Sequence, residues 1–123
     1  MTNEISSGRT EQAVRRWRQL VQMDSSAEFR AVTWLGMWLE KVAVALPLIR
    51  QGANAYTISQ EAKIWPRELV DPFVQTAKKM GEAGLARALD LLVEVDYHSK
   101  SGVGDAVTNV ERFLLTVGQE LAR

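Results

Sequence analysis

Apolar residues recur at spacings of three and four along most of the chain, with polar residues between them. This spacing is typical of helices that bury one face. It predicts a first helix from Thr10 to about Val21 and a second from Phe29 to about Ile49. No segment sustains the two-residue alternation of a strand, so the pattern predicts an all-α protein. We expect a compact bundle of five to six helices.

Local signals place the ends of these helices. Ser25–Glu28 and Thr57–Gln60 fit capping boxes, in which a hydroxyl and a carboxylate or amide bond the free N–H groups of a first turn. The helix that starts near Phe29 is apolar around most of its circumference, which is typical of a helix at the centre of a bundle or shared with a partner. Pro47 is expected to bend it or loosen its last turn, and Gly52 to end it.

The second half of the chain is predicted to be helical as well. The short helix that opens at Thr57 should stop at Trp65–Pro66, because the residue before a proline disfavours helix. The later segments are expected to be a helix at about 72–80, a loop at 81–84, a helix from 85 to about 98, a loop at 101–104 and a last helix capped by Asp105.

The first nine residues show no apolar pattern of their own. We expect residues 1–9 to be a flexible segment at a domain boundary, and residues 10–123 to be a single helical domain cut from a longer protein. The polar N-terminus lacks the apolar core of a signal peptide, and the apolar window 42–49 is too short to span a bilayer. We therefore expect a cytoplasmic protein that makes no membrane contact.

Charge and chemistry exclude several function classes. Fifteen basic and fifteen acidic residues cancel, so no overall field attracts nucleic acid or anionic lipid. The absence of cysteine excludes disulfides and cysteine-based sites, and the single histidine, His98, is a poor basis for a metal site. Glu61, Glu68 and Asp71 lie around a predicted turn, where capping or solvation explains them better than paired catalysis. We expect no enzyme activity, cofactor, metal or small-molecule substrate.

Residues 57–80 supply an alternative function. A short helix, a break and a further helix imitate a helix-turn-helix, which would make the chain a small DNA-binding or regulatory domain. A recognition helix usually presents Arg, Asn or Gln near its start, whereas this one would open with the mostly apolar run 72–75. Packing is therefore favoured over DNA recognition for this segment.

Four tryptophans stand out in a chain of 123 residues. Trp17 and Trp38 lie on the main apolar stripes and are predicted to be core residues. Trp34 lies on a second stripe and Trp65 on the irregular turn, so both are candidates for a partner interface. Burial against a neighbouring helix is the open alternative for these two.

Several segments, in order, resemble the C-terminal helical domain, or collar domain, of the bacterial DNA polymerase III delta subunit, which is part of the clamp loader. The most specific is Leu85 to Leu115, which combines a leucine-rich helix, Asp96 with Lys100 four residues later, a small polar loop and Glu111 before apolar residues. The chain departs from the family pattern at the long stretch Trp65–Asp71 and at Gly36. The other matching segments are Gly8–Leu20, the long apolar helix, Gly52 with the short capped helix after it, and Pro72-Phe-Val with Ala77-Lys-Lys79.

The resemblance implies a function in assembly. In such loaders the C-terminal domains of five subunits form a helical ring, so the expected partners are other clamp-loader subunits, and DNA is reached only through the whole complex. The parent holoenzyme is a DNA polymerase, but this domain is expected to be non-catalytic. We also hypothesise that Asp96, Lys100 and Glu111 form one structural cluster that fixes the angle between the last two helices. An isolated Asp96–Lys100 pair, stabilising by only about 0.2–0.5 kcal/mol, is the alternative.

Overall fold

The computed structural model describes residues 1–102 and 105–122, and these residues form helices joined by turns and short loops, without a strand. The predicted all-α bundle is confirmed. Six α-helices and one short 3₁₀ turn follow one another in the described residues: α1 Thr2–Ser6, α2 Thr10–Met23, α3 Ala27–Arg50, α4 Ala55–Ala62, η1 Arg67–Leu69, α5 Val70–Ser101 and α6 Ala106–Leu121.

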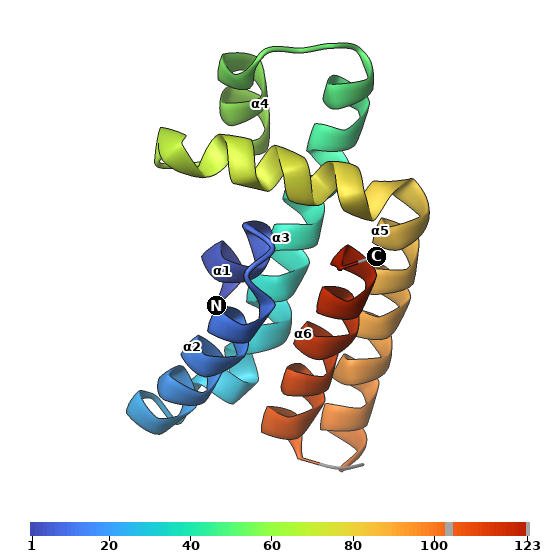
Figure 1. The fold of residues 1–123 in the computed structure, drawn as a ribbon. Coiled ribbons are helices and arrows are strands. Elements are labelled where there is room, and N and C mark those ends of the chain that lie inside the picture. Colours follow the sequence, from blue (N-terminus) through green and yellow to red (C-terminus); the bar gives the residue numbers. More distant parts are fainter. Residues whose placement is uncertain (103–104, 123) are drawn as a thin grey trace.

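Helix α3 is the centre of the bundle. It runs antiparallel to the second half of α5, while α6 lies beside that half and α1 and α2 lie on the other side of α6 (Figure 1). Helix α4 and the first half of α5 lie together across one end of the bundle, at the top of the view. The largest fully buried side chains come from almost every element and include Ile5, Trp17, Leu35, Leu39, Phe73, Phe113 and Leu114. One continuous core therefore joins the N-terminal helices to the last helix.

The length of α3 corrects one expectation. Residues 42–49 are too few to span a bilayer, but the 24 residues of α3 are, by length and composition, long and apolar enough to do so. In the bundle, eight of its residues are buried and it contacts α1, α2, α4, α5 and α6. These contacts explain the apolar residues on the buried side of α3, while Phe29, Met37 and Val44 of the same helix are exposed.

Residues 1–9 differ from the predicted flexible segment. Helix α1 occupies Thr2–Ser6, and Ile5 is fully buried. Met1, one helical turn before Ile5, is almost buried too, and its amino group forms an ion pair with Glu4 at 2.9 Å. Two apolar residues four apart suffice to anchor a short helix onto a bundle, although they are too few to form a recognisable periodic pattern.

Two of the predicted caps are placed differently. Helix α3 starts at Ala27, and its N-cap residue, Ser26, makes no side-chain cap bond. The Ser26 hydroxyl and N–H instead donate to the carboxylate of Asp24, at 2.6 Å and 2.9 Å, and these bonds lower the pKa of Asp24. Helix α4 starts at Ala55, earlier than the predicted start at Thr57. Its N-cap is Asn54, whose side chain accepts a hydrogen bond from the Thr57 N–H. The third cap is confirmed, since Asp105 accepts from the Val107 N–H at 3.2 Å.

The predicted loop at 81–84 is a kink within one long element. Gly81 has φ 64° and ψ −178°, and helix continues on both sides of it. This backbone conformation is essentially restricted to glycine. Gly84 is buried within the helix, so only one residue of the expected loop leaves helical geometry. The kink turns α5 from the end of the bundle to the side of α3 (Figure 1).

Gly81→Ala is expected to lower the free energy of unfolding by about 1–3 kcal/mol, because alanine is strained at this φ. A side chain itself would meet nothing within 4 Å, so the effect would come from the backbone alone. Urea denaturation followed by circular dichroism measures it. The control is Ala83→Gly on the exposed side of the same helix, and a Gly81→Ala variant as stable as the parent would contradict the prediction.

Candidate interaction surface

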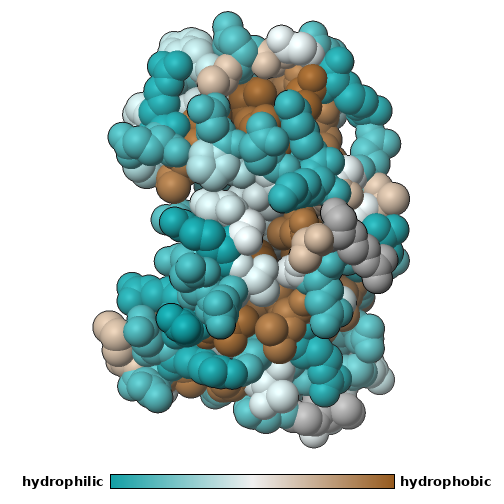
Figure 2. All heavy atoms as spheres, in the orientation of Figure 1, coloured by the Kyte–Doolittle hydropathy of each residue, from teal (hydrophilic) through white to brown (hydrophobic). Residues whose placement is uncertain are grey.

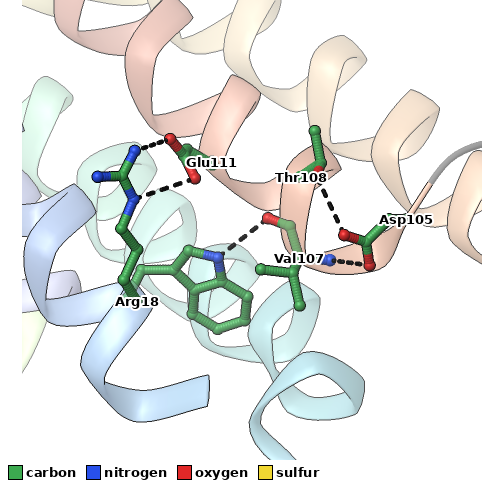
Figure 3. Close-up of polar contacts among 6 residues, drawn as sticks. Arg18, Asp105, Val107, Thr108 and Glu111 are labelled. Atoms are coloured by element: carbon green, nitrogen blue, oxygen red, sulfur yellow. Dashed lines mark hydrogen bonds and ion pairs between the residues drawn. The ribbon is translucent and has the colours of Figure 1, made fainter. Parts of the chain in front are cut away.

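Helices α2 and α6 are joined by polar contacts next to the core. The indole N–H of the buried Trp17 donates to the carbonyl of Val107 at 3.0 Å. One residue along α2, the guanidinium of Arg18 holds the carboxylate of Glu111 through two nitrogens (Figure 3). The hydrogen bond and the charge of Glu111 raise the pKa of Arg18. Val107 and Glu111 are one helical turn apart, so the same side of α6 makes both contacts.

The hypothesis of one Asp96–Lys100–Glu111 cluster is wrong. Lys100 does pair with Asp96, at 3.1 Å between Nζ and Oδ2, on the surface of α5. Glu111, however, is on the side of α6 that faces α2, where its partner is Arg18. Sequence proximity to the loop suggested a contact with α5, but helical phase decides the direction of a side chain. The pair that links two helices is therefore Arg18–Glu111, which the sequence analysis missed.

Double-mutant cycles distinguish the two arrangements. Arg18→Met combined with Glu111→Gln is expected to show a coupling free energy that decreases as salt is added, because an exposed ion pair is screened. Lys100→Met combined with Glu111→Gln is expected to show none. Urea denaturation of the parent, the three single variants and the two double variants at two salt concentrations gives both values. Coupling of Glu111 to Lys100 instead of to Arg18 would restore the original cluster.

Trp34 and Trp65 line one cavity, although they are distant in the sequence. Trp65 is 75% exposed, whereas Trp34 is partly buried with the Arg30 guanidinium 5.4 Å from the centre of its ring. The cavity has a volume of about 140 Å³. Its walls come from α1, α3, the segment before η1, η1 and the start of α5, and include Trp38, Lys41, Ile64, Leu69 and Phe73. The structure thus brings the two candidate interface residues to one site.

The other two tryptophans are buried, as predicted. Trp17 is fully buried and Trp38 nearly so. The indole N–H of Trp38 has no hydrogen-bond partner among residues 1–102 and 105–122. Trp38 therefore contributes an apolar wall to the cavity and an unused donor next to it.

The segment proposed for DNA recognition is mainly a packing element. The first half of α5 buries Val70, Phe73, Ala77 and Met80, which are the positions one helical turn apart that face the bundle. Of the first residues that a recognition helix would present, Gln75 is exposed but Phe73 is in the core. A helix whose N-terminal turns are buried against α3 and α4 offers few groups to a DNA groove.

The described residues offer little for catalysis. Across 1–102 and 105–122, no group of three or more His, Asp or Glu side chains is placed to hold a metal ion. His98 is half-buried near the end of α5, with its ring 6.0 Å from that of Tyr97. Glu61, Glu68 and Asp71 are all exposed. None of these side chains has the buried, paired setting in which acids and bases are tuned for catalysis.

Large apolar side chains are exposed at several places outside the cavity. The face shown in Figure 2 is mainly hydrophilic, with separate hydrophobic patches. Other exposed apolar side chains lie on α3 and on the second half of α5. Exposed apolar groups on neighbouring helices are typical of surfaces that another protein covers.

A comparison with protein families identifies the chain. Residues 1–117 match the family described as the DNA polymerase III delta subunit, C-terminal domain. The chain belongs to this family. The resemblance expected from the segments around Asp96 and Glu111 is thereby confirmed, and the domain is a component of the clamp loader. Neither the curated proteins nor the solved structures gave a significant match. The match to the delta C-terminal domain includes α1, the helix that the sequence analysis had left outside the domain.

Proposed function

We propose that this delta C-terminal domain is an assembly domain that contributes helices to the pentameric collar of the clamp loader, which supports loading of the sliding clamp in DNA replication. The observation that carries the proposal is the family match over residues 1–117. In this proposal the chain is part of a longer cytoplasmic subunit, and its partners are the other loader subunits. It reaches DNA only through the complete complex and contributes no catalytic group.

The surface of the domain supports an assembly function. Its net charge is zero, so no overall field favours non-specific DNA binding. Aromatic residues next to a cavity are the kind of group that anchors protein interfaces. We therefore assign Trp34 and Trp65, with the cavity between them, to a partner interface.

Association with the other loader subunits tests the proposal. The domain, purified as part of its full subunit, is expected to co-elute with the remaining clamp-loader subunits in size-exclusion chromatography. Trp65→Ala should weaken this association without lowering stability, because the side chain is largely exposed. Leu115→Ala on α6, which removes an exposed apolar side chain away from the cavity, is the matched control.

The DNA-binding alternative makes the opposite prediction. A domain that bound duplex DNA through residues 57–80 would show affinity that falls steeply with salt, in proportion to the phosphates contacted. The assembly proposal predicts weak DNA affinity at moderate salt. Failure to associate with any loader subunit, together with salt-dependent DNA binding, would overturn it.

A further inference from the structure

Trp65 is a wall that two hollows of the surface share. One is the tryptophan cavity of about 140 Å³. The other has a volume of about 270 Å³ and is lined by Ser59, Gln60, Lys63, Ile64 and Trp65. Ile64 lines both as well, but it is buried, whereas the Trp65 side chain is largely exposed and free to contact a partner. We call the two hollows together with Trp65 the Trp65 site.

The tryptophan cavity has the size and the walls for one apolar side chain. Apolar cavities of about 150 Å³ hold a benzene ring, and this cavity is close to that size. An aromatic residue that is exposed beside such a cavity is the arrangement in which a partner's anchor side chain binds. Most of the wall is aromatic or aliphatic and consists of Trp34, Met37, Trp38, Ile64, Trp65, Leu69 and Phe73.

The charged side chains of the Trp65 site are both positive. Lys41 lines the cavity and Lys63 lines the second hollow, and among the described residues no Asp or Glu lines either one. The Lys41 Nζ donates to the Lys63 carbonyl at 3.1 Å, so the two residues lie next to each other. Neither lysine forms an ion pair within residues 1–102 and 105–122. A partner that places carboxylates beside an apolar anchor therefore complements this site.

The site also has hydrogen-bond donors without acceptors. An ammonium group has three donors, and that of Lys41 uses one of them on the Lys63 carbonyl. The buried indole N–H of Trp38, next to the cavity, has no partner in the part of the chain that the structure describes. Buried donors are normally paired, so acceptor oxygens are the groups that a partner can usefully bring. A carboxylate supplies two of them.

We propose that the Trp65 site binds an acidic–apolar segment of another clamp-loader subunit. One apolar side chain of this segment fills the tryptophan cavity, and neighbouring carboxylates pair with Lys41 and Lys63. The inference rests on the proposed assembly function and adds the chemistry of the partner. Single-stranded nucleic acid also combines stacking on aromatic rings with cations, but two lysines neutralise few phosphates and give weak binding at moderate salt.

Charge reversal at Lys63 tests the acidic partner. In competition binding of the full subunit to the purified remaining loader subunits, Lys63→Glu is expected to weaken association at least about tenfold, because it sets acid against acid. Lys63→Gln should weaken it less, since it removes an attraction without adding a repulsion. The Lys63 side chain is exposed, so neither change should alter the melting temperature. Lys79→Glu, at an exposed lysine of α5 that lines neither hollow, is the matched control and should bind as the parent does.

A second pair of variants tests the charge within the cavity. Lys41→Gln keeps a donor for the Lys63 carbonyl but removes the charge, so it is expected to weaken association while the melting temperature stays near that of the parent. The double variant Lys41→Gln/Lys63→Gln should lose part of the salt dependence of association, because an attraction between opposite charges is screened by salt. Lys79→Gln should keep the salt dependence of the parent.

The possible outcomes separate this inference from the assembly function. Association of Lys63→Glu and of the double variant at parent strength, or stronger association of Lys63→Glu, would overturn the acidic segment and leave the assembly function intact. Absence of association by the parent subunit would overturn the assembly function itself. A fluorescein-labelled oligothymidine that binds the parent but not Trp65→Ala or Lys63→Glu would identify single-stranded DNA as the occupant and reject the proposal. Self-association of the subunit that Lys63→Glu abolishes, with unchanged binding to the other subunits, would identify a second copy and also reject it.

Discussion

Trp17→Ala is expected to lower the free energy of unfolding by about 3–5 kcal/mol, the range for removing a large buried aromatic side chain. Trp17 is fully buried between α2 and α6, and its indole N–H bonds the carbonyl of Val107. The substitution leaves a cavity and removes a hydrogen bond that joins helices from opposite ends of the chain. For a domain of this size, such a loss is a large part of the total stability.

Trp17→Phe separates these contributions. Phenylalanine fills most of the space of the indole ring but cannot donate a hydrogen bond to the Val107 carbonyl. We therefore expect a smaller loss in the free energy of unfolding, about 1–2 kcal/mol. Urea denaturation followed by circular dichroism at a helical wavelength gives both values without depending on the fluorescence of the residue that is removed. A Trp17→Ala variant that unfolds within about 1 kcal/mol of the parent would show that α2 and α6 are not held together by this side chain.

Gly118→Ala is expected to be the most disruptive single-methyl substitution, with a cost of about 1–3 kcal/mol or more. Gly118 of α6 is buried against the first residue of α2, and a Cβ at position 118 would lie 2.8 Å from the Cβ of Thr10. Rotation of the threonine side chain cannot relieve a contact with its Cβ, so α2 and α6 would have to separate. Overpacking of this kind forces backbone shifts in a dense core.

Two further variants test the cause of this effect. Thr10→Gly removes the atoms that the new methyl would meet, so the double variant Thr10→Gly/Gly118→Ala should be more stable than the sum of the single effects predicts. Gly36→Ala is the matched control, because it makes the same change in a helix where the nearest atom is 3.8 Å away. It should stabilise the protein by about 0.4–1 kcal/mol. Equal effects at positions 36 and 118 would refute a steric origin.

The sequence predicted the helices well because their positions follow from the spacing of apolar residues. The long apolar stripe of α3 and the Asp105 cap of α6 are local patterns, and each was found where the pattern indicated. Local patterns were less exact for α5. The residues Gly81 and Gly84 look alike in sequence, but only Gly81 leaves the helix, while Gly84 is buried beside Met80. Which glycine bends the chain depends on tertiary packing.

The candidate site depended even more on tertiary structure. The sequence singled out Trp34 and Trp65, but nothing local shows that the two line one cavity. It also singled out Glu111 and assigned it the wrong partner, because Arg18 is 93 residues away in the chain. Trp17 and Arg18 are consecutive residues of α2, whereas their partners Val107 and Glu111 are one helical turn apart on α6.

The bond between Trp17 and Val107 has a consequence for synthesis. The two residues are separated by 90 positions. At about 5–20 residues per second, the ribosome makes the acceptor roughly 5–18 seconds after the donor. During this interval the ribosome has made α2 but not α6, the helix against which α2 packs.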